Sequence, residues 1–219
     1  MQDVFRDLLA TAGVEEHCEL RSPVGFMALH GGLEAATFEI ARASAERCGA
    51  SLYAVVQPEG LSWHVPSHRF DPADSPRLAS FCSHVEVVVS LHGYGGVRGS
   101  ERRWTTIVLG GGGRAQAAVV AGELRRHLPD YTVVDDIDEV PRAYRGLHPR
   151  NPVNRVRTAG VQVELPPRVR GRSPMWADHD VEAEPFTPHT RALVDALASA
   201  ATELRRDATP GHLGPGPRR

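Results

Sequence analysis

Short apolar runs alternate with helix-favouring segments along most of this 219-residue chain. The apolar runs are rich in β-branched residues and are bounded by Gly or Pro, which is typical of buried strands. They lie at 24–30, 51–59, 85–92, 104–113, 131–137 and 160–167, and the helix-favouring segments lie at 4–12, 33–48, 75–82, 114–127 and 188–206. This alternation predicts an α/β fold: a single domain with an open, twisted, mixed or mostly parallel sheet flanked by helices.

Two of the predicted strands end in the same dipeptide. VGFMALH ends at His30 and VEVVVSLH ends at His92, and a glycine follows each histidine. Ligands of open α/β sheets collect beyond the carboxyl ends of strands, and glycine lets backbone and solvent approach closely. If the two strands are neighbours, the two imidazoles converge at one edge of the sheet.

A carboxylate follows the first of these histidines at short range. Glu34, which we expect at the start of the following helix, completes a set of two histidines and one glutamate with His30 and His92. This is the ligand set of a catalytic zinc that keeps one position open for water. A lone histidine at a strand end is more often a hydrogen-bonded polar residue, but the repeated His-Gly and the spaced glutamate favour a metal. Glu39 is the alternative carboxylate, although on a helix it would face away from Glu34.

A second carboxylate, Glu164, stands at the end of the GVQVE strand. A buried carboxylate is costly unless it has a use, so Glu164 is the candidate general base for an activated water. An exposed glutamate paired with an arginine explains the same pattern equally well at this stage.

Guanidinium groups are the only basic side chains available besides histidine, because all 25 Lys and Arg residues are arginine. Asn154 and Arg155 lie in the turn-prone segment NPVNR, and Arg69 lies in SHRFD. Arginine grips carboxylates with two parallel hydrogen bonds, so these residues are candidate contacts for a substrate carboxylate. Surface residues on ordinary loops are the simpler alternative.

Charge and composition limit the expected cellular location of the protein and the classes of its binding partners. The formal charge of −2 gives no reason to expect nucleic acid or an anionic membrane as partner. The three cysteines form no CxxC pair, and no apolar run is long enough to cross a bilayer, so we expect a reduced, cytoplasmic location. The domain is predicted to span 1–206, followed by a flexible Pro/Gly/Arg tail at 207–219.

Two further features allow other interpretations. LGGGGRAQAA (109–118) could cradle a phosphate as part of a non-enzymatic module, although it lacks the GK[ST] ending of a P-loop. Nine more histidines are predicted to be surface residues, with His148 the one nearest to a predicted substrate contact: His17, His64, His68, His84, His127, His148, His179, His189 and His212.

Taken together, six stretches resemble the poly-γ-glutamate hydrolase family of small zinc enzymes, which are related in fold to the zinc carboxypeptidases. They are HGGLEAATFE (30–39), HRFD (68–71), SLHG (90–93), GGGGR (110–114), NPVNR (151–155) and GVQVEL (160–165). They follow the order of the family and cover most of the chain from about 24 to 170.

The resemblance implies one zinc ion held by His30, Glu34 and His92, with Glu164 as general base. It implies that Asn154 and Arg155 contact a substrate carboxylate. The family commonly has one more residue between the first histidine and the ligand glutamate, so the tighter spacing here leaves Glu39 as a second possibility.

The implied activity is zinc-assisted hydrolysis of amide bonds in γ-linked glutamate polymers or similar carboxylate-rich peptides. Another acyl-amide, such as a γ-glutamyl peptide, a peptidoglycan fragment or an N-acyl amino acid, fits the same residues. The predicted specificity loops at 60–84, 93–104 and 168–186 carry no pattern that decides between these substrates, and the sequence does not determine the oligomeric state.

Overall fold

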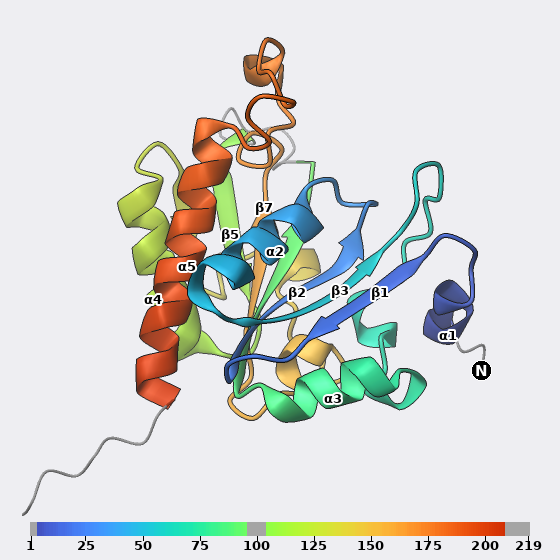
Figure 1. The fold of residues 1–219 in the computed structure, drawn as a ribbon. Coiled ribbons are helices and arrows are strands. Elements are labelled where there is room, and N and C mark those ends of the chain that lie inside the picture. Colours follow the sequence, from blue (N-terminus) through green and yellow to red (C-terminus); the bar gives the residue numbers. More distant parts are fainter. Residues whose placement is uncertain (1–3, 96–103, 209–219) are drawn as a thin grey trace, which may run out of the picture.

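The computed structural model describes residues 4–95 and 104–208, and within these a mixed seven-stranded sheet forms the centre (Figure 1). The strands lie side by side in the order β1-β3-β2-β4-β7-β5-β6. Their bounds are β1 Glu15–Glu19, β2 Val24–Gly31, β3 Ser51–Val56, β4 Val87–Gly93, β5 Thr106–Gly110, β6 Thr132–Val134 and β7 Val161–Leu165. The predicted α/β fold with a mixed, helix-flanked sheet is confirmed.

Strand direction sets where functional residues gather. β3, β2, β4 and β7 run parallel to one another, whereas β1 is antiparallel to β3 and β5 is antiparallel to β7. The carboxyl ends of β2, β4 and β7 therefore meet at one edge in the middle of the sheet, where open α/β sheets bind ligands.

Helices and loops cover both faces of the sheet (Figure 1). On one face, the apolar side chains of the strands pack against α2 (Thr37–Cys48), α4 (Arg114–His127) and α5 (Pro188–Ala208). On the other face, α1 (Val4–Leu9) and α3 (Pro76–His84) form a smaller core with the loops. Among the described residues, no helix combines the length and the apolar character of a membrane span.

Most of the predicted elements are present, and two differ. β1, with the sequence EEHCE, was not expected, because its polar residues give no strand pattern. α2 begins at Thr37 rather than near residue 33, after a left-handed turn at Ala36 (φ 69°). Most of the predicted tail, 209–219, lies outside the described residues, as does 96–103 of the predicted specificity loop.

Candidate active site

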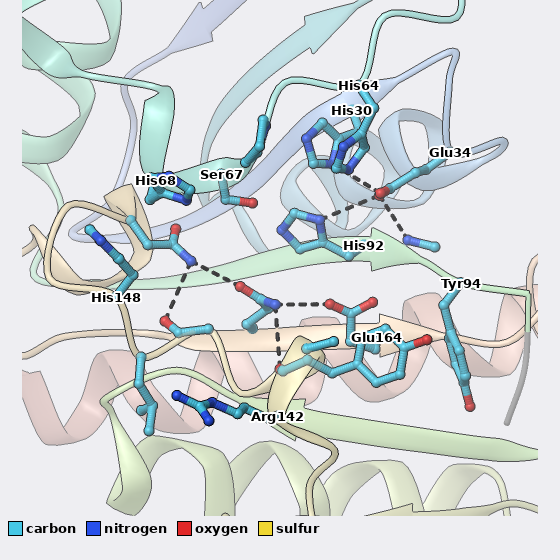
Figure 2. A pocket seen from close by; sticks show the side chains of 18 of the residues that line it. His30, Glu34, His64, Ser67, His68, His92, Tyr94, Arg142, His148 and Glu164 are labelled. Atoms are coloured by element: carbon cyan, nitrogen blue, oxygen red, sulfur yellow. Dashed lines mark hydrogen bonds and ion pairs between the residues drawn. The ribbon is translucent and has the colours of Figure 1, made fainter.

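Three neighbouring central strands deliver the main functional side chains. His30 lies at the end of β2, His92 near the end of β4 and Glu164 near the end of β7. His92 stands directly opposite Glu164 in the register of β4 and β7. All three line a cavity of about 610 Å³ at the carboxyl edge of the sheet (Figure 2). The two His-Gly strands are neighbours, so the condition under which their imidazoles converge is met.

An irregularity in β2 turns His30 toward the cavity. The pairing of β2 with β3 shifts between Ala28 and Gly31, where three steps along β2 match two steps along β3. Ala28 belongs to the core on the α2 face, and strict alternation would place His30 on that face as well. The extra residue places His30 on the opposite face, which also carries His92 and Glu164.

Glu34 lies in a tight turn and not on the helix. Its N–H donates to the His30 carbonyl (2.8 Å), so the chain folds back over the end of β2. Gly32 makes this turn possible, because it has φ +77° and a Cβ atom there would lie 2.1 Å from the Gln57 carbonyl oxygen.

This turn aims the Glu34 carboxylate at both histidines (Figure 2). Its Oε1 lies 2.9 Å from His30 Nδ1, and its Oε2 lies 3.4 Å from His92 Nδ1 and accepts the Gly93 N–H at 2.9 Å. Burial raises the pKa of the Glu34 carboxyl. The hydrogen bonds and charges of the two histidines outweigh this effect, so the pKa of Glu34 lies well below its usual range. Glu39 is exposed and does not line this cavity, so Glu34 is the carboxylate beside the two histidines.

The hydrogen bonds of His30 show why this cluster suits a metal ion. His30 Nε2 lies 2.8 Å from the Val65 carbonyl, which can only accept, so Nε2 carries the proton. A neutral His30 then presents the lone pair of Nδ1 to an ionised Glu34, which also only accepts. Two acceptors at 2.9 Å need a cation between them, either a proton or a metal.

A third histidine approaches the same point from a loop. His64 lies on the exposed loop after β3, and its ring centroid is 4.7 Å from that of His30. Single ligand atoms of His30, Glu34 and His64 lie within 4.8 Å of one another. The cluster therefore offers both His92 and His64 as a third ligand, and the prediction of His64 as a plain surface residue was incomplete. Its position could not be foreseen because the loop is placed by the side chain of Gln57, which bonds the Trp63 backbone.

Two side-chain amides, one bonded to the other, hold the Glu164 carboxylate in place. Gln162 Nε2 donates to Glu164 Oε1 (2.8 Å), and Asn151 Nδ2 donates to Gln162 Oε1 (3.0 Å). Burial raises the pKa of Glu164, and the neighbouring Glu34 charge raises it further, whereas His92 and the Gln162 bond lower it; the net shift is upward. A buried, hydrogen-bonded carboxylate with a raised pKa beside a candidate metal cluster can act as a proton acceptor. Gln162 was missed, although the alternation in VQVEL places it on the same face.

Comparison with known proteins fits this arrangement. A family model described as poly-gamma-glutamate hydrolase matches residues 10–191. The chain belongs to this family. The UPF0714 protein YndL of Bacillus subtilis (strain 168) is 32% identical to this chain over 150 residues, which are 67% of this chain and 54% of that protein. The chain thus spans about half the length of this curated relative.

Three solved structures share the fold: a bacteriophage poly-gamma-glutamate hydrolase, zinc-free YndL and a metallo-carboxypeptidase. A bacteriophage poly-gamma-glutamate hydrolase matches with TM-score 0.69 and 21% identity, over 89% of this chain and 91% of that chain. Zinc-free YndL matches with TM-score 0.66 and 22% identity, over 95% and 100% of the chains. A metallo-carboxypeptidase from Burkholderia cenocepacia matches with TM-score 0.50 and 9% identity, over 94% and 68%.

Three residues predicted to bind substrate do not line the cavity of this family member. Arg155 forms an ion pair with Asp71 (2.8 Å), and Arg69 lies in the 3-10 turn Ser67–Arg69. Asn154 donates to the Gly146 (2.7 Å) and His148 (3.0 Å) carbonyls and accepts the Gly112 N–H (2.8 Å). Asn154 therefore ties the cavity loop to the glycine run, and substrate contact by these three residues stays a prediction.

Replacing Asn154 by Ala should lower stability more than substrate affinity. The variant loses three hydrogen bonds, so we expect the free energy of unfolding to fall by about 2 kcal/mol. Urea unfolding followed by circular dichroism measures this loss. A variant of unchanged stability but strongly raised KM would instead support direct substrate contact.

The outer wall of the cavity is basic. His68, His148 and Arg142 line it, and the rings of His68 and His148 lie 4.6 Å apart (Figure 2). Burial and the nearby His148 lower the pKa of His68. His148, noted from the sequence as a possible border of the substrate site, does lie at the cavity.

The glycine run does not form a phosphate cradle. The Gly111 and Gly113 amides donate to the carbonyls of Arg145 and Gly160, and the Gly112 amide donates to Asn154. These N–H groups hold neighbouring loops instead of facing a ligand, so the structure gives the phosphate-binding interpretation no support.

Proposed function

We propose that the chain is a zinc-dependent hydrolase that cleaves amide bonds in γ-linked glutamate polymers. The observation that carries the proposal is the Glu34 carboxylate between the Nδ1 atoms of His30 and His92, beside the buried Glu164. Membership of the poly-gamma-glutamate hydrolase family supports the polymeric, anionic substrate. The zinc-free YndL structure and the metallo-carboxypeptidase fold support a metal at this position.

We assign one zinc ion to His30, Glu34 and His92. His92 is preferred to His64 as third ligand because it is buried (3% exposed) on a strand, whereas His64 is exposed on a loop. His92 Nε2 also has an outer partner, Ser90 Oγ at 3.2 Å, of the kind that orients metal-binding histidines. A bound zinc would supply a Lewis acid that polarises a carbonyl and makes water more acidic.

Side chains of the protein would then provide proton transfer and substrate binding. Glu164 accepts the proton of the attacking water and returns it to the departing amine, and Gln162 holds its carboxylate toward the cavity. Among the described residues, Arg142 is the arginine that lines the cavity, and we propose that it binds a carboxylate of the polymer.

Incubation of zinc-loaded protein with γ-linked polyglutamate tests the proposal. We expect shortening of the polymer that a chelator abolishes and added zinc restores, whereas α-linked polyglutamate stays intact. If the γ-linked polymer stays intact while a γ-glutamyl dipeptide, a peptidoglycan fragment or an N-acyl amino acid is cleaved, the site belongs to the alternative substrate class.

Substitution of Arg142 by Ala should weaken substrate binding. Loss of one charge-assisted hydrogen bond costs about 1.5–3 kcal/mol, so we expect KM to rise by about tenfold or more with kcat within about twofold of the parent. Arg157→Ala is the control, because Arg157 is exposed and pairs with Glu86 beyond the opposite end of β4. An unchanged KM in Arg142→Ala would contradict the assignment.

A further inference from the structure

One buried guanidinium connects three backbone segments that adjoin the residues assigned to the site. Arg170 follows β7 and is 9% exposed. Its Nε, Nη1 and Nη2 atoms donate to the carbonyl oxygens of Leu165 (3.1 Å), Ala35 (2.8 Å) and Tyr94 (3.1 Å). All three of these acceptors are backbone carbonyls, so the Arg170 guanidinium holds three segments of the main chain together.

Each of these carbonyls adjoins a residue assigned to the site. Ala35 directly follows Glu34, and Leu165 directly follows Glu164. Tyr94 comes after Gly93, the glycine that follows His92. These three stretches are far apart in the sequence, and a rigid planar group with several fixed donor directions fixes their relative positions better than a flexible ammonium can.

The glycine after His92 provides the space for this guanidinium. A Cβ atom on Gly93 would lie 2.7 Å from Arg170 Cζ, 2.8 Å from Nη1 and 3.0 Å from Nε. The guanidinium therefore lies against the backbone of Gly93, whose N–H donates to Glu34 Oε2 (2.9 Å). Arg170 thus supports Glu34 in two ways, through the Ala35 carbonyl and through Gly93.

The turn that bears Glu34 has little regular structure of its own to hold it. It precedes the first residue of α2, and it includes Ala36 in a left-handed conformation that is unfavourable for any residue with a Cβ atom. A backbone in such a conformation persists only where its surroundings hold it. The bond from Arg170 to Ala35 is one such constraint at the middle of the turn.

We propose that Arg170 is a positioning residue that sets the separation of Glu34, His92 and Glu164 for zinc binding and proton transfer. It contacts neither the proposed zinc nor the substrate and acts through the three backbone segments. This inference rests on the proposed zinc hydrolysis, and its metal-binding part can be tested without any substrate.

Arg170→Lys tests the inference, because it keeps the charge and the aliphatic stem but loses the planar set of donors. We expect the zinc dissociation constant, measured by competition with a chelating dye, to rise by about 10- to 100-fold, as for other outer partners of metal ligands. At saturating zinc, kcat should fall and KM should stay within twofold. Arg172→Lys, an exposed arginine of the same segment, should match the parent in both measurements.

Gly93→Ala is the second variant. It keeps Arg170 in the sequence, but the added Cβ atom displaces the Arg170 guanidinium. It should reproduce the zinc defect, and hydrogen exchange of the Gly93 amide in the zinc-free protein should speed up in Arg170→Lys. Parental zinc affinity in either folded variant, even with a lower melting temperature, would overturn the inference. If the parent binds zinc but cleaves no γ-linked polymer, the proposed function fails and the zinc titrations still decide the role of Arg170.

Discussion

Glu164→Gln should retain zinc and lose nearly all hydrolysis. The amide keeps the shape of the side chain and can still accept the bond from Gln162, but it cannot accept the proton of water. We expect kcat to fall by about 10²- to 10⁴-fold, the range for loss of a general base, with the zinc dissociation constant within a few-fold of the parent. Glu39→Gln, which changes an exposed carboxylate of α2, is the matched control and should stay fully active. Parental kcat in zinc-loaded Glu164→Gln would remove Glu164 from the mechanism.

The same substitution should stabilise the zinc-free protein at neutral pH. The fold raises the pKa of Glu164, so this carboxyl favours folding most below its unfolded pKa, and that contribution is lost as the pH rises through the folded pKa. The glutamine has no charge to bury, so its melting temperature should exceed that of the parent at pH 7 and approach it at low pH. Calorimetry of the chelated proteins measures the difference, and a lower melting temperature for the variant at pH 7 would contradict the raised pKa.

His30→Ala and His92→Ala should each lose tight zinc binding. Each removes one of three protein ligands, so we expect the zinc dissociation constant to rise by more than about 100-fold, which is the upper range for loss of an outer partner alone. Hydrolysis at ordinary zinc concentrations should be lost with it. Isothermal titration with zinc, on proteins shown to be folded by circular dichroism, gives the result directly.

His64→Ala decides between the two possible third ligands. With zinc on His30, Glu34 and His92, removal of the exposed His64 should change the zinc affinity by less than about tenfold, below the cost of a direct ligand. Retention of zinc by His92→Ala together with its loss from His64→Ala would reverse the assignment and place the metal on the loop side of Glu34.

The sequence was informative where side-chain periodicity and strand ends carry the signal. Alternation of strands and helices predicted the sheet, and the His-Gly ends of β2 and β4 predicted which edge bears the site. The edge strand β1 was missed because hydrogen bonding to β3 holds its polar residues, and no apolar pattern marks it.

The detailed geometry of the site depends on contacts between segments that are distant in the sequence, and a local sequence pattern does not predict such contacts. Strict alternation would have turned His30 away from Glu164, and an irregularity in β2 reverses this. The approach of His64 depends on hydrogen bonds between Gln57 and the loop backbone. Arg155 was expected at the substrate, but its ion pair with Asp71 joins two loops that are distant in the sequence.

Diffraction from crystals of the zinc-loaded protein, recorded on both sides of the zinc absorption edge, locates the proposed zinc ion directly. The proposed zinc site predicts a single anomalous peak about 2.0–2.1 Å from His30 Nδ1, His92 Nδ1 and a Glu34 oxygen, with one position open toward Glu164. A peak coordinated by His64 in place of His92, or the absence of any peak in this cavity, would contradict it.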